Sequence, residues 1–505
     1  MPADIVLSTL NTRFGHCSFG LRYLRANLKH YRDRSQIREF TIGQRPIDIV
    51  EEILAENPRI VAFGVYIWNT APITEIVFLL KKIRPEITVV LGGPEVSHET
   101  EHQPVCNAAD FVVRGEGEVV FAWLCEQILS GNTPTQHIWE GGLPLLSELS
   151  LPYDEYTDTD IAQRTVYVEA SRGCPFRCEF CLSSLDKSVR KFPIDNLLPA
   201  LKRLLDRGLL QFKFVDRTFN LDIATSRSIL EFFLSHQRPD LFVHFEMIPD
   251  RLPEELRDVI SRFPKAALQF EIGIQTFDPD VSARISRRQK VDVAEDNLRF
   301  LNQHTGVHLH TDLIFGLPGQ TVATIAQDFD RLRGLGPHEI QVGILKRLRG
   351  APITRHDIDW GMVYSPVPPY EVLCTHDVDF PTMQHLKRFS QLWDRVGNSG
   401  YFAETLVWMF NGGSPFQRFS DFTHQVYRNH HRSHSVALTT LAEELFLFLT
   451  NDLVYPSKQI ATILASDFLR THQKSFPESV AAFLDTPYRT PRNQPAPTSR
   501  QDRHS

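Results

Sequence analysis

Three cysteines, Cys174, Cys178 and Cys181, form a C-x3-C-x2-C pattern directly after a short β-branched run at residues 165–168. Cysteine thiolates are the usual protein ligands of iron–sulfur clusters, and three on one loop would hold three irons of a four-iron cluster. The fourth iron would stay open to a substrate or cofactor, which a fully ligated electron-transfer cluster does not allow. The pattern therefore predicts a reactive iron–sulfur site.

Two other interpretations of the cysteines are weaker. A structural zinc site needs four protein ligands, and a catalytic one needs three with an open position, but no fourth cysteine lies near this loop. A disulfide with a spare thiol requires an oxidising compartment, whereas the first apolar run, residues 5–10, is too short for a secretory signal. We therefore expect a cytoplasmic protein that carries an iron–sulfur cluster.

Composition limits the remaining possibilities. The chain has 505 residues and is 42% hydrophobic, which is enough for two or three domains with cores. Its net charge of −7 gives no electrostatic case for nucleic-acid binding. No run approaches the roughly 18 apolar residues of a membrane helix. We expect neither a nucleic acid nor a membrane as a partner.

Residues 1–130 alternate between strand-like and helix-like patterns. Strands are expected at 5–7, 37–42, 60–67, 88–91 and 110–113, and helices at 19–28, 47–54, 73–83 and 119–129. Strict β/α alternation predicts a parallel sheet covered on both faces, of the flavodoxin-like (Rossmann) type. Ligands of such sheets bind beyond the carboxyl ends of the strands.

The rest of the chain divides into four parts. Residues 131–164 show no persistent period and are interpreted as a linker. Six further β/α units follow over 165–350, with strands expected at 165–169, 211–215, 242–247, 268–274, 307–315 and 340–345. Residues 351–485 have mostly helical patterns. The segment 486–505 is rich in Pro, Arg, Ser and Gln and is expected to be disordered.

The cysteine motif, with the aromatic Phe180 before its last cysteine, resembles the signature of the radical S-adenosylmethionine (SAM) superfamily. In that family the open iron binds the amino and carboxylate groups of SAM, and an electron from the [4Fe–4S] cluster cleaves SAM to a 5′-deoxyadenosyl radical. The resemblance implies that residues 165–350 form a partial (β/α)6 TIM-like barrel. It also implies SAM contacts from Phe180, Asp216, Glu246, Gln275 and Arg287, with Arg287 preferred to Arg288.

The loops of the first domain extend the resemblance. Gly92-Gly-Pro-Glu95 and Gly115-Glu-Gly-Glu118, ahead of the cysteines, resemble the cobalamin-binding domain of class B radical SAM methyltransferases. The cobalamin contacts implied are Asn11, Thr12, Arg13, His16, Trp68, Asn69, Gly92, Gly93, Pro94, Glu95, Gly115, Glu116, Gly117 and Glu118. The Asp-x-His-x-x-Gly motif that ligates cobalt is absent, because His16 has no Asp two residues before it.

These features together predict an enzyme. We expect a radical SAM enzyme that uses a [4Fe–4S] cluster, SAM and cobalamin to methylate an unactivated carbon of a small molecule or peptide. An electron donor such as flavodoxin or ferredoxin would serve as a partner. Two alternatives remain open: a cobalamin-dependent rearrangement or cyclisation without methylation, and a first domain that docks a protein or RNA partner instead of cobalamin.

Overall fold

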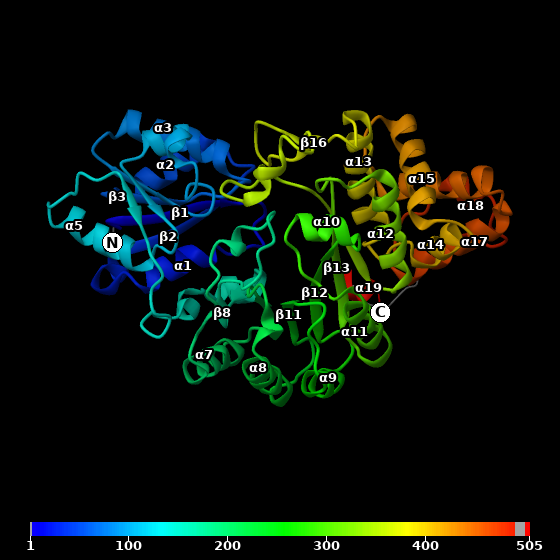
Figure 1. Cartoon of the computed structure of the whole chain (residues 1–505), viewed down its shortest axis with the longest axis horizontal. Helices are drawn as coiled ribbons and strands as arrows, with labels where there is room; N and C mark the ends of the chain where they lie inside the picture. The colour runs from blue at the N-terminus through cyan, green and yellow to red at the C-terminus, as the bar shows by residue number, and fades with distance from the viewer. Residues whose placement is uncertain (1–2, 490–499, 505) are drawn as a thin grey trace.

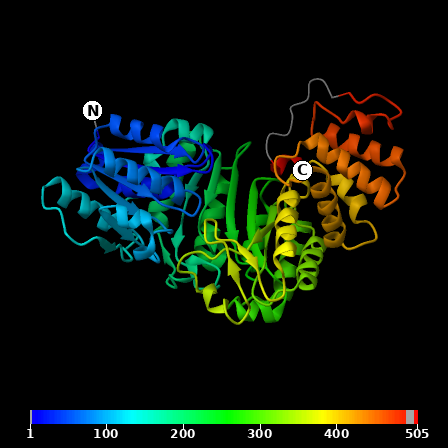
Figure 2. The same ribbon diagram turned by 90° about the horizontal axis from the view of Figure 1, so that it is seen from above.

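The computed structural model describes residues 3–489 and 500–504. An N-terminal α/β domain and a C-terminal helical domain lie on opposite sides of a central curved sheet (Figures 1 and 2). This arrangement confirms the predicted α/β class and the helical C-terminal region.

The first sheet is parallel throughout and has the strand order β2-β1-β3-β4-β5-β6. Its strands are β1 (Ile5–Asn11), β2 (Ser35–Thr41), β3 (Ile60–Gly64), β4 (Thr88–Gly92), β5 (Phe111–Arg114) and β6 (Ile138–Glu140). The helices are α1 (Phe19–Ala26), α2 (Pro46–Ala55), α3 (Thr70–Ile83), α4 (Pro104–Ala108) and α5 (Glu118–Leu129). Two separate apolar clusters show that α2, α3 and α4 cover one face and that α1 and α5 cover the other.

The segment predicted to be a linker contains regular structure. The strand β6 adds a sixth member to the first sheet by pairing with β5, and α6 (Asp158–Gln163) precedes the second sheet. A three-residue strand is too short to show a period. The helix α6 does carry a start signal, because the Thr157 side chain accepts a bond from the Asp160 backbone and the Asp160 carboxylate accepts one from the Thr157 backbone.

The second sheet is also parallel and has the order β14-β13-β12-β11-β10-β7, so its two outer strands do not pair with each other. Its strands are β7 (Val166–Val168), β10 (Gln211–Phe214), β11 (Phe242–Met247), β12 (Leu268–Gln275), β13 (His308–Phe315) and β14 (Glu339–Ile344). The helices that follow them are α7 (Ile194–Asp206), α8 (Ile223–Ser235), α9 (Glu254–Ser261), α10 (Pro279–Arg284), α11 (Val291–His304) and α12 (Val322–Gly334). This is the open six-stranded barrel that the sequence predicts.

The two faces of the second sheet differ sharply. Phe212, Phe245, Phe270, Leu309 and Ile340 belong to the buried apolar core. The alternating set from the same strands is polar: Lys213, His244, Glu246, Glu271, His310, Asp312, Glu339 and Gln341. Register pairs such as Glu246 with Glu271 and His310 with Glu339 place this second set on one face, because paired residues of neighbouring strands point the same way. We call it the concave face.

The remaining elements complete the C-terminal part. Its helices are α13 (Phe380–Val396), α14 (Ala403–Phe410), α15 (Pro415–His430), α16 (Leu438–Leu447), α17 (Ser457–Arg470), α18 (Glu478–Ala481) and α19 (Arg500–Arg503). Two short pairs of antiparallel strands are β8 (Ser171–Arg172) with β9 (Arg190–Lys191), and β15 (Val363–Tyr364) with β16 (Val372–Cys374).

The C-terminal tail departs in part from the predicted disorder. Residues 490–499 and 505 lie outside the described part of the chain. The helix α19 instead docks at the amino ends of the barrel strands, where Arg500 pairs with Glu339 at 3.0 Å and Arg503 donates to the Ser399 carbonyl at 2.7 Å. These charged partners come from residues far away in the sequence, so composition alone could not reveal them.

Candidate cofactor sites

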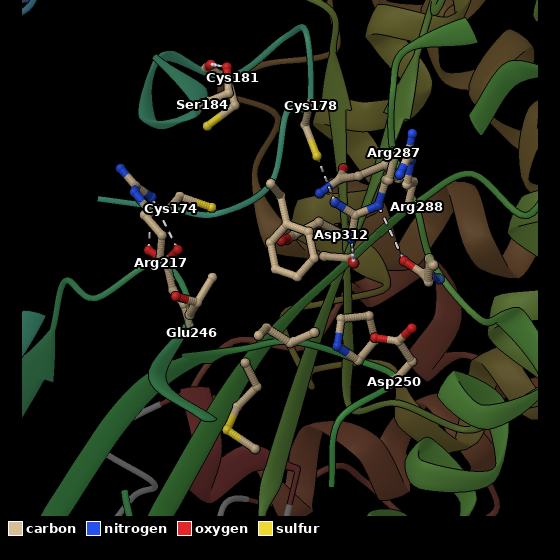
Figure 3. Close-up of a pocket in the computed structure, with 18 of the residues that line it drawn as sticks. Cys174, Cys178, Cys181, Ser184, Arg217, Glu246, Asp250, Arg287, Arg288 and Asp312 are labelled. Carbon is tan, nitrogen blue, oxygen red and sulfur yellow. Dashed lines mark hydrogen bonds and ion pairs between the residues drawn. The ribbon is translucent and has the colours of Figure 1, made fainter. Parts of the chain in front are cut away.

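The cysteine loop is held between β8 and β9, at the carboxyl end of the first barrel strand. Gly173 must be glycine there: its φ is +88°, and a Cβ would lie 2.1 Å from the Ser188 carbonyl oxygen. Cys174, Cys178 and Cys181 line one pocket of about 230 Å³, into which their sulfur atoms project (Figure 3).

The donor chemistry of this pocket fits the predicted cluster. Cys174 and Cys178 are buried, and burial raises the pKa of both thiols, so the thiolate forms need a bound cation or metal. No three His, Cys, Asp or Glu side chains within residues 3–489 and 500–504 are arranged to hold a single metal ion. The match between this pocket and an iron–sulfur cluster therefore rests on the three cysteines, which line the same pocket.

Arg287 reaches this pocket, as predicted. Its Nη1 donates to Cys178 Sγ at 3.6 Å, its Nε donates to Gln289 Oε1 at 3.2 Å, and its Nη2 donates to the Gly273 carbonyl. Arg288 lines the same pocket. The guanidinium of Arg287 thus lies against the cysteine loop, where it also opposes the rise in the pKa of Cys178 that burial causes.

Gln275 occupies a strained position at the mouth of the barrel. The pairing of β12 with β13 is irregular between Gly273 and Gln275, and the φ of Gln275 is +72°. Its side chain folds over Gly273, where a Cβ would lie only 2.5 Å from Gln275 Nε2. Its Oε1 is buried without a hydrogen-bond partner in the described part of the chain. A buried acceptor that lines this pocket fits a hydrogen-bond donor of SAM.

Glu246 also lines the pocket, and it has a partner that the sequence reasoning missed. Arg217 Nη1 donates to both Glu246 oxygens, at 2.9 and 3.1 Å. Burial raises the pKa of Glu246 to about 7, while Arg217 acts in the opposite direction. The position of Arg217, directly after Asp216 at a strand end, was the available signal.

The structure places Asp216 differently from the prediction. It is buried and does not line the pocket, whereas Phe180 does. Its carboxylate accepts bonds from the Ala170 backbone amide at 2.9 Å and from Ser171 Oγ at 2.6 Å. Burial raises its pKa to about 6. Because its oxygens are used within the protein, Asp216 positions the start of the cysteine loop rather than the SAM amino group.

Below the mouth of the barrel, titratable side chains of neighbouring strands contact one another across the concave face. Glu271 Oε2 lies 3.1 Å from His244 Nε2 and 4.0 Å from Lys213 Nζ. Burial raises the pKa of Glu271, but the hydrogen bond with His244 and the nearby His310 and Lys213 outweigh this effect, and the pKa falls to about 2. His310 lies 3.4 Å from Asp312, and Asp312 and Glu339 raise its pKa to about 10. The concave face is therefore charged and polar.

A second pocket, of about 290 Å³, lies at the carboxyl ends of the first sheet. Six of the predicted cobalamin contacts line it: Gly92, Gly93, Gly115, Glu116, Gly117 and Glu118. Its other walls are largely apolar and include the aromatic residues Phe19, Tyr23, Tyr66 and Phe121, which the sequence reasoning missed. Gly93 has a φ of +106°, and a Cβ there would lie 2.6 Å from the Val65 carbonyl oxygen. An apolar pocket with a glycine floor fits part of a bulky cofactor such as cobalamin.

The other predicted cobalamin contacts lie outside this pocket. Thr12, Arg13 and Pro94 are exposed. The remaining five have partners within the protein: Asn11 and Glu39 (3.1 Å), His16 Nδ1 and the Tyr167 hydroxyl (2.7 Å), Trp68 and the Leu10 carbonyl (3.0 Å), Asn69 and the Leu10 carbonyl (3.1 Å), and Glu95 and Arg349 (2.9 Å). These loops were chosen because they follow strands, but His16 and Glu95 instead contact the barrel domain, and the other three side chains contact their own domain.

Arg172 lines the second pocket and adjoins the cysteine motif of the first. It lies two residues before Cys174, and its Nη1 is 2.8 Å from both Glu116 and Glu118 of the second pocket. Its Nε donates to Glu169 at 2.9 Å, and its guanidinium lies 4.5 Å from the centre of the Tyr23 ring. Burial raises the pKa of Glu169 to about 7, against the effect of Arg172. The sequence reasoning missed Arg172, although it adjoins the motif.

An open parallel barrel with three cysteines on the loop after its first strand, together with a Rossmann-type domain, defines a radical SAM protein with an attached cofactor-binding domain. Comparison with known families confirms this class. The B12 binding domain matches residues 8–124, and the radical SAM superfamily matches residues 168–332. Residues 358–493 match a protein of unknown function (DUF4080). The chain is thus an enzyme that combines a B12-binding and a radical SAM domain, and its cofactors are a [4Fe–4S] cluster, SAM and cobalamin.

Individual relatives agree with this class. The chain is 25% identical over 330 residues to an uncharacterized methyltransferase of Pyrococcus horikoshii, covering 60% of this chain and 70% of the relative. It is 26% identical over 354 residues to the cobalamin-dependent radical SAM methyltransferase TokK of Streptomyces tokunonensis, covering 61% of this chain and 51% of TokK. The chain therefore spans only about half of TokK.

A solved structure supports the fold. The radical SAM methyltransferase TsrM of Kitasatospora setae, solved with cobalamin and a [4Fe–4S] cluster bound, has a TM-score of 0.57 at 17% identity. The match covers 70% of this chain and 77% of TsrM. No helix in the part of this chain that the structure describes is long and apolar enough to cross a membrane.

Proposed function

We propose that this protein is a cobalamin-dependent radical SAM methyltransferase that methylates an unactivated carbon. The observation that carries the proposal is the link through Arg172, which bonds the glycine-rich loop of the B12-binding domain to the segment that leads into Cys174. The cofactors supply a carbon radical on the substrate and a methyl group to add to it. Two such cofactors must face one reaction space, and Arg172 fixes their two loops against each other.

The protein's own side chains have distinct roles in this proposal. Cys174, Cys178 and Cys181 hold the cluster, while Gln275, Glu246 and Phe180 bind SAM, with Arg287 at its carboxylate. A planar guanidinium suits a carboxylate because it can donate two parallel bonds. The glycines, Glu116 and Glu118 would hold cobalamin, whereas His16 lies outside that pocket with its Nδ1 bonded to the Tyr167 hydroxyl. A flavodoxin or ferredoxin would supply the electron.

The test uses the anaerobically reconstituted full chain and SAM labelled on its methyl carbon. Methylation predicts that label is recovered with cobalamin after incubation and that 5′-deoxyadenosine forms. Formation of 5′-deoxyadenosine with cobalamin that stays unlabelled would contradict methylation and favour rearrangement or cyclisation. A chain that retains no cobalamin would remove the role proposed for the first domain.

A further inference from the structure

A third pocket, of about 490 Å³, lies at the outer edge of the barrel sheet, between β14, α13 and the loop 433–435. The strand pair β13–β14 separates it from the cofactor pocket. Gln341 of β14 lines it, and the register partner of Gln341 on β13 is Asp312, which lines the cofactor pocket. Both side chains belong to the concave face, so a molecule in the third pocket can extend toward the cofactors.

The charges of this pocket are unbalanced. Its two acidic side chains have partners, because Glu371 pairs with Lys387, and Asp394 pairs with Arg500 at 3.0 Å. Lys346 and Arg395 remain, and no ion pair to either is found in the described part of the chain. We call these two residues the cationic pair.

The positive charge of Arg395 is not simply a solvated surface charge. Its Nη2 donates to the Val436 carbonyl, which fixes the guanidinium. Its Nη1 is buried and has no hydrogen-bond partner among the described residues. A buried charged donor without a partner is costly unless a ligand supplies an acceptor. A guanidinium is suited to a carboxylate or a phosphate.

The floor of the pocket leaves room for such a ligand. Gly343 lies near the carboxyl end of β14 and lines the pocket without a side chain. A Cβ there would contact only the Leu313 carbonyl oxygen, at an ordinary 3.6 Å. The sheet thus tolerates a side chain at this position, and its absence leaves the space open.

We propose that this pocket is the anion-binding subsite of the substrate, and that a carboxylate or phosphate group of the substrate binds to the cationic pair. The reacting carbon would then lie over the concave face toward Asp312. The assignment of the bound anion to a substrate rests on the proposed function, whereas anion binding itself does not. Arg395 and the loop 433–435 belong to the C-terminal region of unknown function, so the proposal gives that region a role in substrate recognition.

Isothermal titration of the reconstituted full chain with inorganic phosphate, and separately with acetate, tests the subsite. We expect saturable binding of at least one anion to the wild type. Lys346→Met and Arg395→Met should each weaken it by about tenfold, the usual effect of losing one charge-assisted hydrogen bond. Tighter binding of phosphate would indicate a phosphorylated substrate, and tighter binding of acetate a carboxylate. The control is Lys202→Met, which removes an exposed lysine of α7 paired with Asp206 and should change nothing.

Gly343→Leu provides a second variant that keeps every charge. Its side chain should fill the pocket and abolish anion binding, even if Arg395→Met proves unable to fold. Equal anion affinity in the wild type, Lys346→Met and Gly343→Leu would overturn the subsite, as would the absence of saturable binding to the wild type. Iron, cobalt and SAM binding of the same wild-type preparation test the cofactors separately, so failure of the subsite and failure of the proposed function can be distinguished.

Discussion

Arg172→Met tests whether one buried arginine couples the two cofactor loops. The substitution keeps an apolar side chain of similar length but removes the charge between Glu116, Glu118 and Glu169. The side chains of Arg172, Glu118 and Glu169 are only 13%, 7% and 8% exposed. Removing one partner of a buried ion pair costs about 3–5 kcal/mol. We therefore expect local opening of both loops to become roughly 10²- to 4 × 10³-fold more frequent, since about 1.4 kcal/mol corresponds to a factor of ten.

Native-state hydrogen exchange of residues 115–118 and 169–174 measures this opening directly. The effect should depend on pH. The pKa of Glu169 is already raised to about 7 by burial, and removal of Arg172 raises it further. A carboxyl whose folded pKa is raised stabilises the fold at low pH and loses this contribution as pH rises, so the defect should be larger at pH 8 than at pH 6.

Arg203→Met is the matched control for Arg172→Met. Arg203 lies 3.5 Å from Asp154, and both side chains are more than half exposed, so this pair is worth only about 0–1 kcal/mol. Exchange in Arg172→Met that stays within about threefold of the control at both loops would refute the coupling role of Arg172.

Two further predictions concern the pocket walls. Gly93→Ala should lower the thermal unfolding midpoint and weaken cobalamin binding, because its Cβ would meet the Val65 backbone, whereas Gly115→Ala, with a φ of +74° but open space around its Cβ, should cost only about 1–2 kcal/mol. Equal midpoints for these two variants would contradict the close approach at Gly93. Glu246→Gln should flatten the fall in stability between about pH 4.5 and pH 7 by up to about 3 kcal/mol, because the raised pKa of Glu246 makes its charged form increasingly unfavourable as pH rises from the ordinary glutamate pKa to about 7. Glu231→Gln, at an exposed ion pair on α8, is the control, and an unchanged pH profile in Glu246→Gln would show that the carboxyl is not desolvated as described.

The strong local patterns of the sequence predicted most of the fold. The C-x3-C-x2-C spacing, and the apolar runs that became β1, β3, β4 and the barrel strands, depend only on neighbouring residues. Short elements such as β6 and α6 were missed because three to six residues cannot establish a period.

The side-chain roles were harder to predict, because they depend on contacts between distant residues. Arg172 acquires its role from Glu116, 56 positions away, and Glu95 is engaged by Arg349, 254 positions away. Asp216 was assigned by its place at a strand end, but the nearby amide of Ala170 and hydroxyl of Ser171 use its oxygens. Glu246, Gln275 and Arg287 do line the predicted pocket, since side chains at the ends of parallel strands meet at one mouth. Their contacts with SAM stay predictions.

The most direct test of the account is the metal content of one anaerobic preparation of the full chain, reconstituted with iron, sulfide and hydroxocobalamin and then desalted. We predict about four irons and about one cobalt per chain in the wild type. Cys174→Ala should lose the iron but retain the cobalt, because Cys174 lines only the cluster pocket. Iron without cobalt in the wild type, or iron that survives in Cys174→Ala, would contradict the assignment of two separate cofactor pockets.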